Sequence, residues 1–267
     1  MAEGIRSWLG LALFVMLLPA ALLAQTDCEK GNGRLNFALP KDLTSEALIQ
    51  KFGAAESVTK AARDHYYTQD VRVQTLVANA VDGEFHEVTN ISYDDKGKRI
   101  ENVTFAEQST LRRIALTPED LEDIHTFMPF MLSTEDLPQY NLRYAGQQHV
   151  DELDTYALHV EPRKLEKNKR YFEGRVWVDS RDFQIVKTCG KSVPNVVQVK
   201  KNQRQDLRPM FVTYRQEVDG HYWFPAYSRA DDTLQFKGGA IHIREVVKYT
   251  DYKRADAKLA GTPSVRQ

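Results

Sequence analysis

Apolar and polar positions in residues 43–66 alternate with the period of a helix. The apolar positions are three or four residues apart and comprise Leu48, Phe52, Ala55, Val58, Ala62 and Tyr66. Thr44 or Ser45 can cap the start of this segment by accepting hydrogen bonds from its first turn. Gly53 lowers helix stability by about 1 kcal/mol relative to alanine, and a close packing contact would explain its presence. The pattern predicts an amphipathic helix that lies on a sheet.

From Thr68 onward the period changes to two, which is typical of strands whose two faces differ. Strands over residues 84–93 and 99–106 are predicted to form a hairpin, because Gly97 in the turn between them can adopt a positive φ. Short reversals separate the later strands and indicate antiparallel pairing. These later strands are predicted over residues 140–149, 155–161, 171–179, 183–191, 210–218, 221–231 and 240–252.

A second helix is predicted over residues 117–132. Pro118 in the first turn and the two acids after it favour a helix start at Thr117. The second half of this segment is apolar on nearly every side, and Pro129 predicts a kink there. Two interpretations remain open. The segment is either a core helix or a movable lid whose Phe and Met side chains form an adaptable apolar surface.

The N-terminus has the layout of a secretory signal peptide. A short polar segment with Arg6 precedes an apolar run over residues 9–24. This run is shorter than the about 20 residues of a membrane-spanning helix, so an uncleaved anchor is the less favoured alternative. We predict cleavage near Ala24, which leaves a mature chain that begins near Gln25 and works outside the cytoplasm. Cys28 does not directly follow the cleavage region, which argues against a lipoprotein signal.

Composition and charge narrow the function classes. The 267-residue chain has a formal charge of -1 at pH 7, so it lacks the basic field expected of a nucleic-acid-binding protein. No linker or fixed repeat divides it, and one domain is expected. No second long apolar segment follows the signal, so we expect a soluble mature chain. Because the chain is exported, a disulfide between Cys28 and Cys189 is favoured over two free thiols.

No catalytic motif of recognisable spacing is present. The sequence lacks a G-x-S-x-G elbow, an H-E-x-x-H helix, a phosphate-binding glycine loop and a cysteine cluster for zinc. The histidines are scattered, and no pair of acids stands out. We therefore predict no catalytic residue, no cofactor and no metal, and we rank a hydrolase with a spatially assembled site lowest.

Cations gather in two stretches between predicted strands. A solvated loop is the usual meaning of such a run. The alternative is contact with an anionic membrane or a protein partner, where each cation near a bilayer contributes about 1 kcal/mol. The candidates for this contact are Arg163, Lys164, Lys167 and Lys169, followed by Arg170. The second stretch comprises Lys200, Lys201, Arg204 and Arg208.

Several segments resemble those of a known family. They comprise GRVWVD at 174–179 followed by FQIVK at 183–187, and DGHYWFP at 219–225. Together with RDHYY at 63–67, they resemble the LolA-like outer-membrane lipoprotein-sorting family over residues 43–252. The chain departs from the usual carrier by being longer, chiefly in the polar connections around residues 163–170 and 190–208.

The resemblance implies an α+β fold with a strongly curved antiparallel sheet, an incomplete β-barrel whose concave face is covered by helices. It also implies a periplasmic carrier that shields the acyl chains of lipoproteins or phospholipids and contributes to outer-membrane biogenesis. The alternative on the same scaffold is an envelope sensor or regulatory protein that binds membrane proteins. In either case we expect a monomer.

These inferences divide the chain into four regions: a signal peptide (1–24), an N-terminal extension (25–42), a half-barrel domain (43–253) and a polar tail (254–267).

The apolar part of the second predicted helix is too apolar to face water, because each fully exposed large side chain is unfavourable by roughly 1.5–3 kcal/mol. It therefore requires either core or ligand. The candidate lipid-binding residues are Phe127, Met128, Phe130, Met131 and Trp177.

Overall fold

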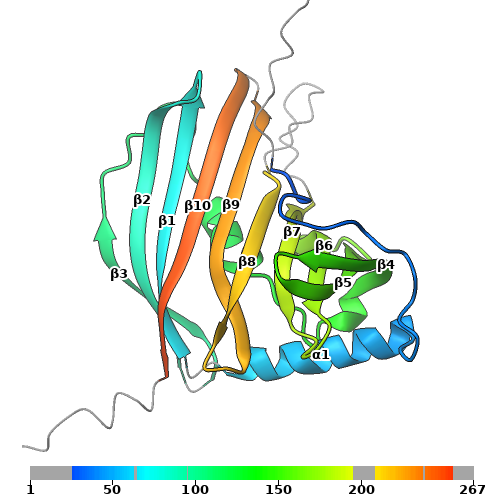
Figure 1. The fold of residues 1–267 in the computed structure, drawn as a ribbon. Helices are drawn as coiled ribbons and strands as arrows, with labels where there is room; N and C mark the ends of the chain where they lie inside the picture. The colour runs from blue at the N-terminus through cyan, green and yellow to red at the C-terminus, as the bar shows by residue number, and fades with distance from the viewer. Residues whose placement is uncertain (1–25, 63–64, 95, 195–207, 237, 255–267) are drawn as a thin grey trace, which may run out of the picture.

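The computed structural model of the chain is shown in Figure 1 and describes residues 26–62, 65–94, 96–194, 208–236 and 238–254. The predicted signal peptide, nearly all of the polar tail, and Lys200, Lys201 and Arg204 lie outside the described residues. Within the described part, ten strands form one antiparallel sheet. They are β1 (His65–Val77), β2 (Ala80–Tyr93), β3 (Arg99–Ala106), β4 (Tyr140–Val150), β5 (Leu153–Pro162), β6 (Tyr171–Asp179), β7 (Ile185–Val193), β8 (Phe211–Val218), β9 (Tyr222–Phe236) and β10 (Gly239–Arg254).

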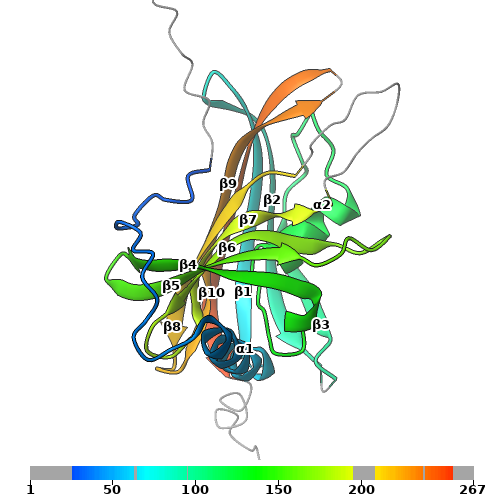
Figure 2. The same cartoon turned by 90° about the vertical axis from the view of Figure 1, so that its right-hand side faces the viewer.

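The sheet is open and curved, which confirms the coarse fold prediction. Its strand order is β3-β2-β1-β10-β9-β8-β7-β6-β5-β4, so that two runs of neighbouring strands are joined where β1 pairs with β10. β3 and β4 are the two edges and do not pair with each other. Figures 1 and 2 show β1, β2 and β10 upright, whereas β4, β5 and β6 run across them. Because of this change of direction the sheet is curved, with a concave inner face and a convex outer face.

The first predicted helix is confirmed as α1 (Ser45–Ala61), which lies along the lower end of the sheet in Figure 1. Thr44 caps it by accepting a hydrogen bond from the backbone of Ala47. A Cβ atom at Gly53 would lie 2.7 Å from Leu137 Cδ1. The glycine is therefore explained by close packing, as the sequence predicted.

The second predicted helix is wrong beyond its first turns. The helix starts after Thr117 as predicted, and Thr117 and Asp120 form a capping box there. However, α2 covers only Pro118–Glu122 and is followed by a π-helical turn over Asp123–Phe127. Two strand side chains bind the carbonyl groups of the next residues: Thr213 Oγ1 donates to Met128 O at 2.7 Å, and Arg215 donates to Phe130 O. Pro129 between them cannot donate to a helix. The helical cover expected over this face is thus limited to α2 and the turn, followed by irregular chain.

Alternation along the strands separates two apolar clusters. Val176 and Val178 of β6 belong to the large inner cluster, which also contains Leu48 and Phe52 of α1. Trp177 between them points to the smaller outer cluster and is fully buried there. It lies among Val150, Ala157, Val186, Cys189, Val212 and Trp223.

The N-terminal extension runs over the outer cluster. Cys28 forms a disulfide with Cys189 of β7, with Cα atoms 5.6 Å apart. Asn32 and Asn36 form isolated bridges with the edge strand β4. Lys187 is fully buried beneath the extension, where its ammonium donates to Lys30 O at 3.0 Å and to Asn32 Oδ1 at 2.7 Å. The extension therefore covers the outer face of the half-barrel.

Candidate functional site

A buried ion pair fixes α1 and the irregular segment to the sheet. Glu56 of α1 and Arg215 of β8 have fully buried side chains, with Arg215 Nη1 3.0 Å from Glu56 Oε1. Glu56 also accepts from the backbone of Ile185 at 2.9 Å. Arg215 donates to the carbonyl groups of Trp223 and Phe130. One charged pair thus connects three parts of the chain.

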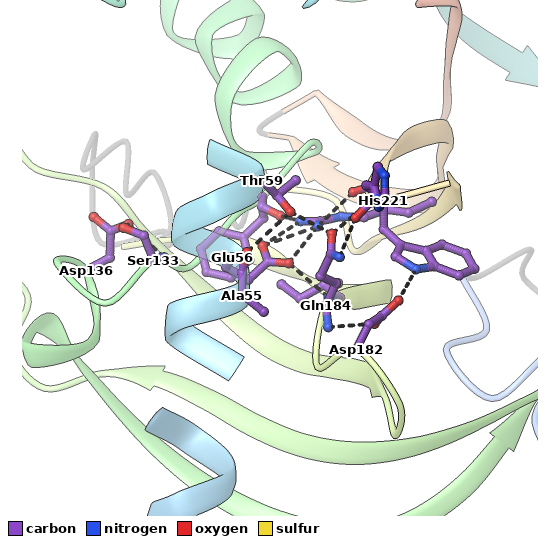
Figure 3. Close-up of polar contacts among 12 residues, drawn as sticks. Ala55, Glu56, Thr59, Ser133, Asp136, Asp182, Gln184 and His221 are labelled. Carbon is purple, nitrogen blue, oxygen red and sulfur yellow. Dashed lines mark hydrogen bonds and ion pairs between the residues drawn. The ribbon is translucent and has the colours of Figure 1, made fainter. Parts of the chain in front are cut away.

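A hydrogen-bond network of polar side chains and backbone groups continues from this pair (Figure 3). Gln184 Oε1 accepts from Thr59 Oγ1 of α1 at 2.6 Å and from the backbone of Trp223 at 3.0 Å. Its amide donates to His221 O at 2.7 Å, and Trp223 Nε1 donates to Asp182 at 2.8 Å. Because every member has a partner, this end of the half-barrel is a rigid support rather than a reactive centre.

The first cavity opens beside the irregular segment and has a volume of about 400 Å³. It lies between the end of α1, the start of β4 and β6, and the lower parts of β1, β9 and β10. Aromatic side chains dominate its wall: Tyr67, Tyr93, Phe127, Phe130, Tyr140, Tyr171, Phe224 and Tyr252. Its size falls within the range of about 300–1,000 Å³ that is common for ligand pockets.

The rings of the first cavity are held in fixed positions. Tyr252 stacks between Tyr67 and Phe224, with ring centroids 5.1 Å apart in each case. Phe130 stacks on Phe172 at 4.2 Å. Burial raises the pKa of Tyr67 and of Tyr252 well above the usual value, so both phenols are neutral. This wall is preorganised and uncharged.

Charged groups at the rim of the first cavity are already paired. Arg99 donates to Tyr67 Oη at 3.1 Å and to Gln69 Oε1 at 2.7 Å. Lys60 lies 2.8 Å from Asp136. Burial, together with the nearby Arg99 charge, lowers the pKa of His125, so this imidazole is neutral at pH 7. Among the residues that the structure describes, the rim therefore offers no unpaired charged group that resembles a nucleophile or a general base.

The second cavity has a volume of about 430 Å³ and lies on the other side of α2, toward the upper parts of β9 and β10. Its wall combines apolar side chains with a charged group. Arg208 lies 3.0 Å from Asp120 and also pairs with Asp123, which in turn pairs with Arg170. Glu245 of β10 lines the same cavity.

The structure divides the predicted lipid-binding residues among three places. Phe127, Phe130 and Met131 line the first cavity, and Met128 lines the second. Phe127 and Met131 are half-buried, whereas Met128 and Phe130 are buried in the core cluster. Trp177 lines neither cavity, because strand alternation points it to the outer face. It therefore does not belong to the candidate site.

The predicted contact residues lie in the loop between β5 and β6. Arg163, Lys164, Lys167 and Lys169 are all exposed, as is Leu165 between them. Arg163 also donates to Tyr140 O at 2.9 Å, which holds the start of the loop. In contrast, Arg170 is half-buried and Arg208 is buried, and both form ion pairs with α2 or the turn after it.

Sequence reasoning missed the strand residues of both cavities. Tyr67 and Tyr252 lie far apart in sequence and meet only because β1 pairs with β10. The strand pattern could have identified Glu245, because its neighbours on the same face of β10, Ile243 and Val247, are apolar and buried. A lone acid in such a stripe indicates either a buried partner or a cavity.

No protein-family model and no curated protein matches the chain. Similar solved structures include a DUF1329 family protein from Desulfovibrio piger, with 13% identity, a TM-score of 0.39, and coverage of 77% of this chain and 92% of that one. A putative outer membrane lipoprotein-sorting protein domain from Vibrio parahaemolyticus has 12% identity, a TM-score of 0.34, and coverage of 79% and 94%. The Pseudomonas aeruginosa MucA/MucB complex has 11% identity, a TM-score of 0.22, and coverage of 75% and 98%.

The second of these structures is described as belonging to the protein class that the sequence resembles. All three TM-scores lie below 0.5, so only the residues of this chain can indicate what it binds. Among the described residues, no helix combines the length and apolar character needed to cross a membrane. The same residues contain no group of three or more His, Cys, Asp or Glu side chains placed to hold a metal ion.

Proposed function

We propose that the mature protein is a periplasmic carrier that binds an acyl chain of a lipoprotein or phospholipid in the first cavity. The observation that carries this proposal is the preformed aromatic wall beside the half-buried side chains of Phe127 and Met131. Burial of hydrocarbon contributes about 0.8 kcal/mol per methylene, so a chain of ordinary length binds without any catalytic group. The carrier acts as a monomer and needs neither a metal nor a cofactor.

The outer face supports the proposed location. A disulfide such as Cys28–Cys189 persists in oxidising compartments, which include the bacterial periplasm. Its first cysteine, Cys28, lies close to the predicted cleavage site after Ala24. Export therefore accounts for both the N-terminal apolar run and the cysteine pair.

Replacement of Phe127 and Met131 by alanine should weaken binding of a fluorescent fatty acid by about tenfold or more. Each truncation removes several carbon atoms from the cavity wall, and lost hydrocarbon contact is worth about 0.8 kcal/mol per methylene. Both side chains are half-buried, so we expect a smaller loss of stability than for a core residue. Fluorescence titration and thermal unfolding measure the two effects.

Leu132→Ala is the matched control. Leu132 is fully buried in the same segment but lines neither cavity. It should lower the free energy of unfolding by about 2–5 kcal/mol, while the folded fraction keeps its affinity for the fatty acid. If the Phe127 and Met131 variant unfolded early yet bound the fatty acid normally, these residues would be structural and the proposed site would be wrong.

The sensor alternative rests on the loop between β5 and β6. It presents Lys164, Lys167 and Lys169 together with Leu165, whose exposed fraction is 52%. Cations next to an exposed apolar side chain suit an anionic membrane surface. In this alternative, the bound acyl chain is a signal and the loop holds the protein at the membrane or on a membrane-protein partner.

Replacement of these three lysines by glutamine should reduce binding to vesicles that contain phosphatidylglycerol. At about 1 kcal/mol for each cation near a bilayer, the loss at low salt reaches about two orders of magnitude. Arg163 is kept because it donates to Tyr140 O. Co-sedimentation measures the effect, with neutral phosphatidylcholine vesicles as the control. Equal binding of wild type and variant to the anionic vesicles would exclude the loop as the contact.

A further inference from the structure

The wall of the second cavity has two chemically distinct parts. The larger part is apolar and consists of Leu116, Met128, Phe211, Leu234, Phe236 and Ile243. The smaller part is charged, and it faces this surface from α2, from the chain before β8 and from β10. A cavity with an apolar wall and a charged end is suited to bind an amphiphile.

Charge at this end is unbalanced toward negative. Among the described residues, the cavity is lined by four acids, Glu119, Asp120, Asp123 and Glu245, and by one cation, Arg208. Arg208 is engaged by Asp120 and Asp123, and Arg170 reaches Asp123 from the other side. The two arginines form their ion pairs with the acids of α2 and of the turn after it. Among the described residues, Glu245 is attracted by the Arg208 charge but forms no ion pair with it.

Glu245 is held against the cavity by its strand. It lies in register with Val73 of β1 and Ala230 of β9, both fully buried, so its backbone position is fixed. Within the described residues its carboxyl group has no hydrogen-bond or ion-pair partner. A carboxylate in a weakly polar site without such a partner is unfavourable, and a cation that enters the site relieves it.

We propose that the second cavity is a separate binding site for a single-chain amphiphile with a primary ammonium head group. The ammonium forms a charge-assisted hydrogen bond with the Glu245 carboxylate, and the alkyl chain lies against Leu234, Phe236 and Ile243. A carboxylate head is disfavoured by the same acids. This site does not depend on occupation of the first cavity, because α2 and the turn after it separate the two.

Protonation of Glu245 adds a pH dependence with a definite sign. Burial, and secondarily the Asp120 charge, raise its pKa to about 7, while Arg208 opposes this rise. The carboxylate is thus largely ionised at pH 8 and largely neutral at pH 6, whereas an alkyl ammonium group with an ordinary pKa near 10 stays charged. Ammonium binding should weaken as the pH falls through 7.

The test uses decylamine, decanol and decanoate below their micellar concentrations, with the mature protein in an isothermal titration. At pH 8 we expect decylammonium to bind wild type about tenfold tighter than decanol does, and decanoate to bind more weakly than decylammonium. Lowering the pH to 6 should weaken decylammonium binding by up to about tenfold and leave decanol unchanged. Glu245→Gln should remove both the preference for the ammonium and its pH dependence.

Stability measurements separate folding from binding in this variant. The raised pKa of Glu245 means that the unfolded state releases this proton at a lower pH than the folded state does, so wild type loses stability as the pH rises from about 4.5 to 7. Glu245→Gln should therefore unfold at the same temperature as wild type at pH 4, and at a higher temperature than wild type at pH 8.

Three results would overturn the proposal: no uptake of decylamine by wild type, equal affinity in Glu245→Gln, or loss of decylamine binding in the Phe127 and Met131 double variant. The last result would place the amine in the first cavity and leave the carrier proposal intact. Conversely, a protein that binds decylamine but no fatty acid would retain this site and refute the carrier.

Discussion

Glu56→Gln should lower the free energy of unfolding by about 3–5 kcal/mol, because it leaves the Arg215 guanidinium buried without its counter-charge. Both side chains are fully buried, so bulk solvent does not reach the remaining charge. The pair also joins α1, β8 and the carbonyl of Phe130. Denaturant unfolding followed by circular dichroism measures the loss.

Lys60→Gln is the matched control on the same helix. Its partner, Asp136, lies at a comparable distance of 2.8 Å, but the two side chains keep 30% and 26% of their surface exposed. Exposed pairs contribute about 0–1 kcal/mol, so this variant should remain close to wild type. A Glu56→Gln loss no larger than that of Lys60→Gln would show that the buried pair does not hold α1 in place.

The double variant Glu56→Leu with Arg215→Met separates charge from packing. Removal of both charges together avoids an unpaired buried ion, so its loss should be smaller than the sum of the two single losses. Recovery should be incomplete, because the carbonyl groups of Phe130 and Trp223 lose their donor.

Loss of the Cys28–Cys189 disulfide should lower the free energy of unfolding by about 2–5 kcal/mol. The two cysteines are 161 residues apart in sequence, so the bond restricts a large loop of the unfolded chain. In the folded chain it also fixes the N-terminal extension on the outer cluster, next to Lys187 and Trp177. We expect the variant Cys28→Ser with Cys189→Ala to show the full effect in denaturant unfolding.

Reduction provides the control for this prediction. Wild type in dithiothreitol should unfold at the same denaturant concentration as the double cysteine variant, and the variant itself should not respond to the reductant. If oxidised and reduced wild type unfolded together, the bond would have no role in stability.

Local patterns were sufficient for most elements of the fold. The change of period at Thr68 and the glycine turn at Gly97 each act over a few residues, and β1 and the hairpin of β2 and β3 follow them. The second helix failed for a non-local reason. The carbonyl oxygens of Met128 and Phe130 accept hydrogen bonds from Thr213 and Arg215, which lie more than 80 residues further along the chain.

The candidate site likewise has features that local sequence indicates and features that depend on residues far apart in the chain. The over-apolar segment predicted that its side chains require either core or ligand. In the structure Phe127 and Met131 line the first cavity, and the pattern did not indicate that two cavities flank the segment. Trp177 was misplaced because a hairpin motif does not state which face of the sheet each residue occupies, and one step along β6 reverses that face. The Glu56–Arg215 pair has a sequence separation of 159 and could not be inferred from either neighbourhood.

Native mass spectrometry of wild-type protein, purified from a bacterial periplasm without detergent, tests the carrier proposal most directly. The proposal predicts a sub-stoichiometric population whose added mass matches a fatty acid or phospholipid, and the Phe127 and Met131 double variant should lack it while Leu132→Ala retains it in its folded fraction. Lipid-free wild type that also takes up no fluorescent fatty acid would contradict the proposal.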